Sequence, residues 1–132
     1  MESINWLAVI VAGISSFMVG GIWYSPSIFG KTWMLENKLS DSQIQEGNKG
    51  KIFGFTFLFS LVMSANLALF LQGSQTDLGR GMAIGFHAGV FTFCAITIHS
   101  LFELKSWKLI LINAGYSVVS LTLMGAILGI WR

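Results

Sequence analysis

The distribution of charged residues constrains the fold most, because four long stretches of the chain carry none. Asp, Glu, Lys and Arg are absent from residues 3–30, 52–76, 81–102 and 109–131. Each stretch exceeds the roughly 20 residues that an apolar helix needs to cross the hydrocarbon core of a bilayer. Only helices and closed barrels satisfy their backbone hydrogen bonds there, and the stretches lack the alternation of a barrel strand. The pattern predicts an all-α integral membrane bundle of four transmembrane helices.

The expected transmembrane spans cover about residues 4–24, 53–72, 81–101 and 108–131. They form a single transmembrane domain over residues 1–132, in which 25–52 is the only sizeable connection. A soluble four-helix domain is the alternative, but its helices would each show a polar stripe. Only 11% of the residues are charged, against about 25% in soluble domains. The first stretch lacks a basic start and a small-residue cleavage site, so we expect an uncleaved span and not a signal peptide.

The lysines predict the orientation in the membrane. Six lysines lie in the first and third connections, whereas the other side carries Arg80 and Arg132. By the positive-inside rule the lysine-rich side faces the cytoplasm, which leaves both termini outside. We therefore expect a multi-pass protein of the inner (plasma) membrane. The net charge of +2 is too small and scattered to indicate a nucleic-acid partner, so the lipid bilayer is the expected surrounding.

The stretch "GGIWYSPSIFGKTW" marks the end of the first span. Trp23 and Tyr24 are residue types enriched at the membrane interface. Ser25 precedes the only proline, and a residue in that position disfavours the helical conformation. Serine is a good N-cap and proline a good first helical residue, so we expect a short interfacial helix to begin at Pro26. A capping-box pattern indicates another helix start at Ser40.

Three segments resemble a known family. They are "NWLAVIVAG", "GGIWYSPSIFGKTWM" and "SLFELKSWKLILINAGYSVVSLTLMGAILGIW". Together they resemble the domain of unknown function 1761 family, which consists of small bacterial multi-pass membrane proteins. The likeness extends over nearly the whole chain, with "FELKSW" standing where a glycine-containing turn is expected. The resemblance implies a fold and a membrane location, and it carries over no activity and no functional residue.

The third span holds the most informative polar residues. On a helical wheel, Gly81, Gly85 and Gly89 share a stripe with His99 and Glu103. A G-x-x-x-G run is the close-packing surface of membrane helices, and side chains four residues apart can meet. Two interpretations of His99 and Glu103 stay open. In the first, they form a pair that handles a proton or a solute at the mouth of a cavity. In the second, His99 hydrogen-bonds a neighbouring helix, while Glu103 anchors the end of the span among the lipid headgroups.

The other polar residues inside the spans suggest contacts between helices. Asn66 lies at about the depth of His87, so we expect these two side chains to meet between the second and third spans. Asn113 enters the bilayer at the depth of His99, so an Asn113–His99 contact is plausible, with Tyr116 close by. Two histidines on different sides of one helix and a single cysteine do not make a metal ligand set.

Small residues on other helices suggest self-association. Gly125 and Gly129 give the fourth span a second G-x-x-x-G, and Ala12, Ser16 and Gly20 form a small face on the first. Small faces on three of four helices exceed what one monomer needs, so we expect a homo-oligomer or a larger membrane complex.

The chain offers no enzyme chemistry that we can identify. It lacks a nucleophile–base set, metal-ligand spacing and a phosphate-binding glycine loop, so we expect no enzyme and no cofactor. Two functions remain. The first is that of a structural or accessory membrane protein, which self-associates or docks on a larger complex. The second is that of a small transporter or channel for a neutral solute or a proton, with a path lined by His99, Asn113 and Tyr116.

Overall fold

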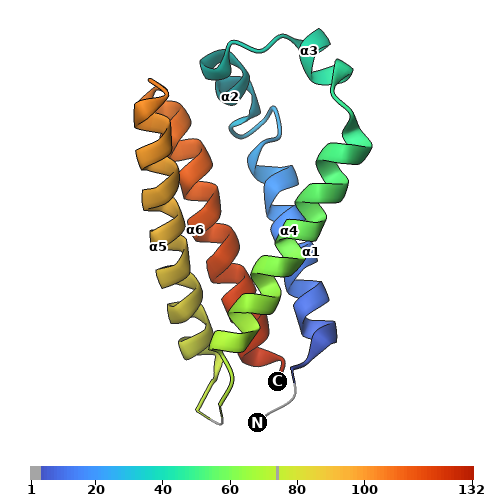
Figure 1. Cartoon of the computed structure of the whole chain (residues 1–132), viewed down its shortest axis with the longest axis vertical. Coiled ribbons are helices and arrows are strands. Elements are labelled where there is room, and N and C mark those ends of the chain that lie inside the picture. The colour runs from blue at the N-terminus through green and yellow to red at the C-terminus, as the bar shows by residue number, and fades with distance from the viewer. Residues whose placement is uncertain (1–3, 74) are drawn as a thin grey trace.

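The structure is a computed structural model that describes residues 4–73 and 75–132. Over these residues the chain is helical and holds no strand (Figure 1). The helices are α1 (Trp6–Trp23), α2 (Gly30–Asn37), α3 (Asp41–Glu46), α4 (Lys49–Phe70), α5 (Leu78–Phe102) and α6 (Trp107–Ile130). Helices α1, α4, α5 and α6 are long and apolar enough to cross a membrane. The all-α fold with four candidate membrane spans is therefore confirmed.

Polar side chains fix where the helices begin. The N-caps that accept a hydrogen bond from a backbone N–H of the first turn are Asn5, Ser40, Asn48, Asp77 and Ser106. At Ser40 the full capping box is present, because the Gln43 side chain also accepts from the Ser40 N–H at 2.8 Å. The helix start that the sequence predicted at Ser40 is confirmed.

The start of α2 differs from the expectation. The helix begins at Gly30 and not at Pro26, and the residues between them form turns. The carbonyl of Ser25 accepts hydrogen bonds from the N–H groups of Ile28 and Gly30, at 3.0 and 2.8 Å. Gly30 is buried so closely against the Tyr24 carbonyl that a Cβ would collide with it. The chain folds back on the end of α1 before it can begin a helix, and only glycine fits there.

The spanning helices pack in the order α5, α6, α1, α4. Helix α6 lies between α5 and α1, and α1 lies between α6 and α4. Helices α4 and α5 follow one another in the chain but meet little. Figure 1 shows α4 leaning away from α5 and α6, with only its C-terminal end close to them. The bundle is therefore open on the side between α4 and α5.

Glycine allows α5 and α6 to pack with their backbones in contact. Gly81, Gly85 and Gly89 are buried in α5, and Gly125 and Gly129 are buried in α6. A Cβ at Gly89 would stand 2.8 Å from the Cα of Val118, and Cβ atoms at the other four would collide with backbone carbonyls. These glycine rows face each other within one chain. They consequently do not require a second copy, which removes one premise of the expected oligomer.

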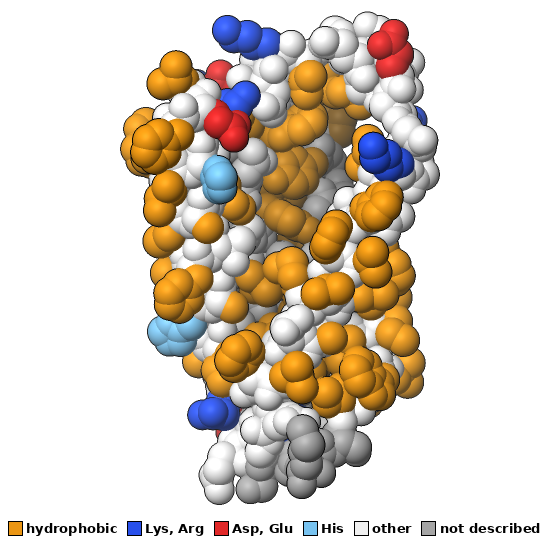
Figure 2. All heavy atoms as spheres, in the orientation of Figure 1, with side chains coloured by type: hydrophobic (Ala, Val, Ile, Leu, Met, Phe, Trp, Pro, Cys, Tyr) orange, Lys and Arg blue, Asp and Glu red, His pale blue; other side chains and the backbone are white. Residues whose placement is uncertain are grey.

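Apolar side chains form a core where α1, α4 and α6 meet. Its buried members are Ala8, Val9, Ala12, Leu67, Ala68, Leu71, Leu121, Met124 and Leu128. Many other large apolar side chains are exposed, among them Met18, Phe59 and Phe91. In Figure 2 hydrophobic side chains cover the middle of the molecule, while charged side chains gather towards its two ends. This distribution suits a surface in contact with lipid along the helices and with water at their ends.

Candidate functional site

A seam of polar side chains holds α1 against α6. The hydroxyl of Ser120 donates to Oγ of Ser16 at 2.8 Å, and the Tyr116 hydroxyl donates to the Ser16 carbonyl at 2.9 Å. Oγ of Ser16 lies 3.0 Å from the Tyr116 hydroxyl, which completes a closed set of hydrogen bonds. Gly20 lies against the Tyr116 ring, since a Cβ there would be in van der Waals contact with the Tyr116 hydroxyl at 3.4 Å. The face of α1 that carries small residues therefore packs against the polar face of α6.

The aromatic pair that ends α1 continues this seam. The indole N–H of Trp23 donates to the Ile112 carbonyl at 2.8 Å, and the Tyr24 hydroxyl donates to Oδ1 of Asn113 at 2.8 Å. A Cβ on Gly115 would lie 3.3 Å from the Trp23 ring, so glycine makes space for the indole. The sequence interpretation of Trp23 and Tyr24 as interfacial aromatics missed this role. Both side chains fasten the end of α1 to α6.

Tyr24 lies just beyond α1 in an aromatic cluster. Its ring centroid is 5.6 Å from that of Tyr116 and 5.9 Å from that of Trp33, both in edge-on contacts. Burial, with a further contribution from the neighbouring Tyr116 phenol, raises the pKa of Tyr24 to about 12 from an ordinary 10.0. The phenol therefore stays protonated, and a donor to Asn113, well above neutral pH.

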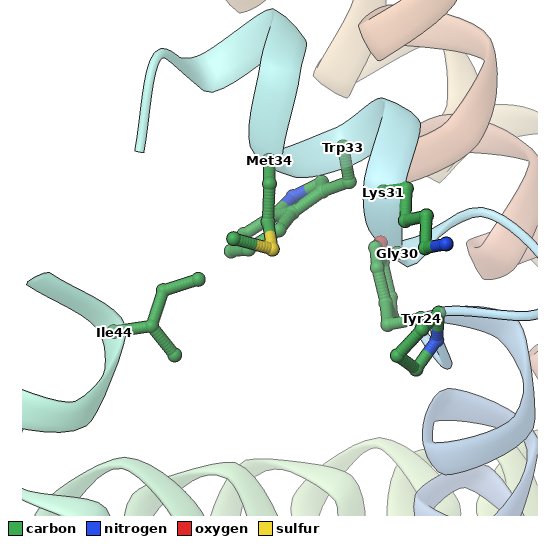
Figure 3. Close-up of a pocket in the computed structure, with 7 residues that line it drawn as sticks. Tyr24, Gly30, Lys31, Trp33, Met34 and Ile44 are labelled. Atoms are coloured by element: carbon green, nitrogen blue, oxygen red, sulfur yellow. The ribbon is translucent and has the colours of Figure 1, made fainter. Parts of the chain in front are cut away.

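A cavity of about 410 Å³ opens next to this cluster. Figure 3 shows Trp33 and Met34 pointing into it from α2, Ile44 facing them from α3, and Tyr24 at its side; Lys31, also from α2, lies beyond Tyr24 with its ammonium turned away from Met34 and Ile44. Pro26 and Gly30 complete the lining. Every lining residue comes from the end of α1 and the connection that follows it. Apart from the Lys31 ammonium and the Tyr24 hydroxyl, the side chains that line it are apolar or, in Trp33, largely so.

A hydrogen bond between two connections steadies the helix above the cavity. Oγ of Ser106, the N-cap of α6, donates to a carboxylate oxygen of Glu36 in α2 at 2.8 Å. Helix α2 also packs against α6. Met34 and Trp33 are therefore carried by a helix that is fixed to the spanning bundle.

The remaining residues that the sequence singled out lie apart from the seam and the cavity. His99 and Glu103 are both exposed at the C-terminal end of α5. Asn113 and His99 form no hydrogen bond with each other; instead, Oδ1 of Asn113 accepts from the Tyr24 hydroxyl. His87 is exposed on α5, and Asn66 is exposed on α4, where it donates to the Val62 carbonyl of its own helix at 2.8 Å. The expected His87–Asn66 contact is likewise not formed, since α4 and α5 diverge.

Residues 4–73 and 75–132 contain no cluster of three or more His, Cys, Asp or Glu side chains that could hold an ion. Cys94 is free and exposed on α5.

The cavity lies among residues that no sequence pattern marks as a site. Its lining residues are not a recognisable chemical motif, because six of the seven are glycine, proline, aliphatic or aromatic. One signal was available, namely the density of aromatic residues around the only proline, in the stretch 20–33. That stretch also belongs to the segments that carry the family resemblance.

Comparison with known proteins supports the resemblance and adds no activity. Residues 7–129 match the model of the family described as "Protein of unknown function (DUF1761)". Searches of the curated proteins and of the solved structures give no match. With four helices that could span a membrane, the chain is a multi-pass membrane protein. It belongs to the DUF1761 family of proteins of unknown function.

Proposed function

We propose that this chain is a non-enzymatic accessory membrane protein that works by associating with other membrane-spanning helices, in further copies of itself or in a larger complex. The observation that carries the proposal is the open side of the bundle between α4 and α5. Helices α4 and α5 present exposed apolar side chains, including Phe55, Phe59, Phe86 and Phe91. A partner helix on this side would complete the packing that α4 and α5 do not give each other.

The polar side chains favour association over transport. Among the described residues, no buried side-chain nitrogen or oxygen lacks a hydrogen-bond partner. Asn113 and Tyr116 bind Tyr24 and Ser16, so they would have to leave these partners to line a path. His99 lies exposed on α5 and is not among their hydrogen-bond partners. The polar groups of α1 and α6 therefore act as contacts between helices.

A substitution on α4 tests the proposal. Gly54 is exposed on α4 and a Cβ built on it meets no atom within 4 Å, so Gly54→Leu adds a bulky side chain to the exposed surface of α4. Gly21→Leu is the matched control, because Gly21 is equally open and exposed but lies on α1, which does not border the open side between α4 and α5. We expect Gly54→Leu to weaken recovery of an associated protein or second copy from native membranes at least tenfold. Gly21→Leu should leave that recovery unchanged.

Two results would contradict the proposal. The first is wild-type protein that leaves native membranes strictly as a monomer with no associated chain, measured by native mass spectrometry in several mild detergents. The second is flux of a solute or of protons in proteoliposomes that Asn113→Ala and Tyr116→Phe abolish while the fold is kept. That result would establish the transporter in its place.

A further inference from the structure

We propose that the cavity beneath α2 and α3 binds an anionic phospholipid, with an acyl chain inside the cavity and the phosphate at Lys31. The inference concerns the end of the bundle that carries most of the lysines. It is independent of the proposed association through α4 and α5.

The size and lining of the cavity fit an apolar chain. Its volume of about 410 Å³ falls within the roughly 300–1,000 Å³ of small-molecule sites. Trp33, Met34 and Ile44 point into it from two helices (Figure 3). Methionine adapts its shape to flexible apolar groups. A soluble polar ligand would find few hydrogen-bonding groups in this lining.

One wall of the cavity is preformed. Tyr24 is held by its 2.8 Å hydrogen bond to Asn113 and by edge contacts with Trp33 and Tyr116. Helix α2, which carries Trp33, is fixed to the start of α6 through Glu36 and Ser106. Binding therefore does not need to order this wall, which lowers the entropic penalty of occupation.

The positive charge of Lys31 favours a lipid with an anionic headgroup. Lys31 is the one charged residue that lines the cavity, and its exposed ammonium has no carboxylate partner among the described residues. The acidic residues of α3, Asp41 and Glu46, are not part of the lining. The only lining residue from α3 is Ile44. An ammonium beside an apolar cavity favours a ligand with an anionic head and an apolar tail.

The position of the cavity favours a lipid as the source of that ligand. It lies beyond the end of the α1 span, beside Trp33 and Tyr24, which are residue types that prefer the membrane interface. Here the phosphates of the bilayer lie next to their acyl chains. A phospholipid can therefore put its acyl chain in the cavity and its phosphate at Lys31 while it stays in the membrane.

Native mass spectrometry of protein extracted from vesicles of equimolar phosphatidylglycerol and phosphatidylcholine tests the inference. We expect wild-type protein to retain one phosphatidylglycerol molecule in preference to phosphatidylcholine. Met34→Trp fills the cavity and should lower this retention at least tenfold. Leu35→Trp is the matched control, because Leu35 is the next residue of α2, is 76% exposed and does not line the cavity.

A second pair of variants tests the headgroup. Lys31→Gln should remove the preference for phosphatidylglycerol, whereas Lys38→Gln should keep it, since Lys38 is exposed at the same end but does not line the cavity. Millimolar inorganic phosphate should not displace the lipid. Displacement by phosphate alone would assign Lys31 to a free anion and overturn the lipid assignment.

Three further results would overturn the inference. These are equal retention by the Met34→Trp and Leu35→Trp proteins, equal retention of the two phospholipids by wild type, and recovery of a free fatty acid instead of a phospholipid. Circular dichroism checks that each variant keeps its helices. If Met34→Trp loses α2, Ile44→Trp fills the cavity from α3 and must give the same loss of retention.

Discussion

The hydroxyl of Tyr24 donates a 2.8 Å hydrogen bond to Oδ1 of Asn113 and thereby joins the end of α1 to the first half of α6. The same tyrosine ring forms part of the wall of the cavity under α2 and α3. One side chain therefore couples the packing of two spanning helices to the shape of the cavity. A substitution at Tyr24 or at Asn113 should therefore affect both the packing of α1 against α6 and the shape of the cavity.

Removal of the Tyr24 hydroxyl should destabilise the protein. We expect Tyr24→Phe to lower the free energy of unfolding by about 1 kcal/mol, since a typical intramolecular hydrogen bond contributes about 0.5–1.5 kcal/mol. Asn113→Ala should lower it by a similar amount, and the double variant by less than the sum of the two. Unfolding in mixed detergent micelles, followed by tryptophan fluorescence, measures all three values.

The coupling energy from this cycle is the decisive quantity. Additive effects would mean that the two side chains do not interact in the folded protein in detergent micelles. Asn66→Ala is the control, because Asn66 is exposed and bonds only within its own helix. The losses in the free energy of unfolding caused by Asn66→Ala and Tyr24→Phe should add up in the double variant.

Alkaline pH should weaken the fold through Tyr24. Its pKa is raised to about 12 in the folded protein, against an ordinary 10.0. Below pH 10 the phenol is protonated in both states, and its stabilising contribution is fully present. Between pH 10 and 12 the unfolded chain releases a proton that the folded chain retains, so stability falls as the pH rises.

The Tyr24→Phe protein isolates this effect from that of the lysines. Over pH 10 to 12 its stability should decline less steeply than that of wild type, measured by thermal unfolding in detergent. Identical slopes for the two proteins would show that Tyr24 titrates alike in the folded and unfolded states. Absorbance of tyrosinate gives an independent titration, because the chain has only 2 tyrosines.

Contacts between glycines make α5 and α6 sensitive to a single methyl group. A Cβ on Gly85 would collide with the Leu121 carbonyl, which is backbone and cannot turn aside. Gly85→Ala should therefore destabilise the protein by about 1–3 kcal/mol, the usual range for an overpacked site. Gly54→Ala is the matched control in a spanning helix, since nothing lies within 4 Å of its added Cβ.

Alanine favours a helix over glycine by about 0.8–1.0 kcal/mol. Gly54→Ala should accordingly leave stability unchanged or raise it. Equal losses from Gly85→Ala and Gly54→Ala would mean that α5 and α6 are not in backbone contact. The measurement is the same detergent unfolding as above.

The sequence was sufficient for the spans because charge and length alone decide which segments suit a bilayer. The predicted spans over about 4–24 and 108–131 correspond to α1 (Trp6–Trp23) and α6 (Trp107–Ile130). Helix α2 was misplaced because its start depends on a contact. The Tyr24 carbonyl packs against Gly30, and the turn that this requires overrides the local preference of Pro26 for a helix start.

Pairing between helices was beyond reach of the sequence for a physical reason. Depth in the bilayer can be estimated from position along a span, but the rotation and neighbours of a helix depend on packing. Asn113 and His99 share a depth, yet Asn113 bonds Tyr24 because α6 lies against α1. The small face of α1 around Ser16 was recognised, but nothing in the pattern showed that Tyr116 and Ser120 would occupy it.

The proposed orientation can be tested with two engineered cysteines in a Cys94→Ala background. Ser42 lies on α3 and Gln75 in the connection between α4 and α5, so α4 alone separates them. Both residues are exposed. If the lysine-rich side is cytoplasmic, a membrane-impermeant maleimide should label Gln75→Cys in intact cells. It should label Ser42→Cys only after permeabilisation. The reverse pattern would invert the topology, and labelling of both in intact cells would mean that α4 does not cross the bilayer.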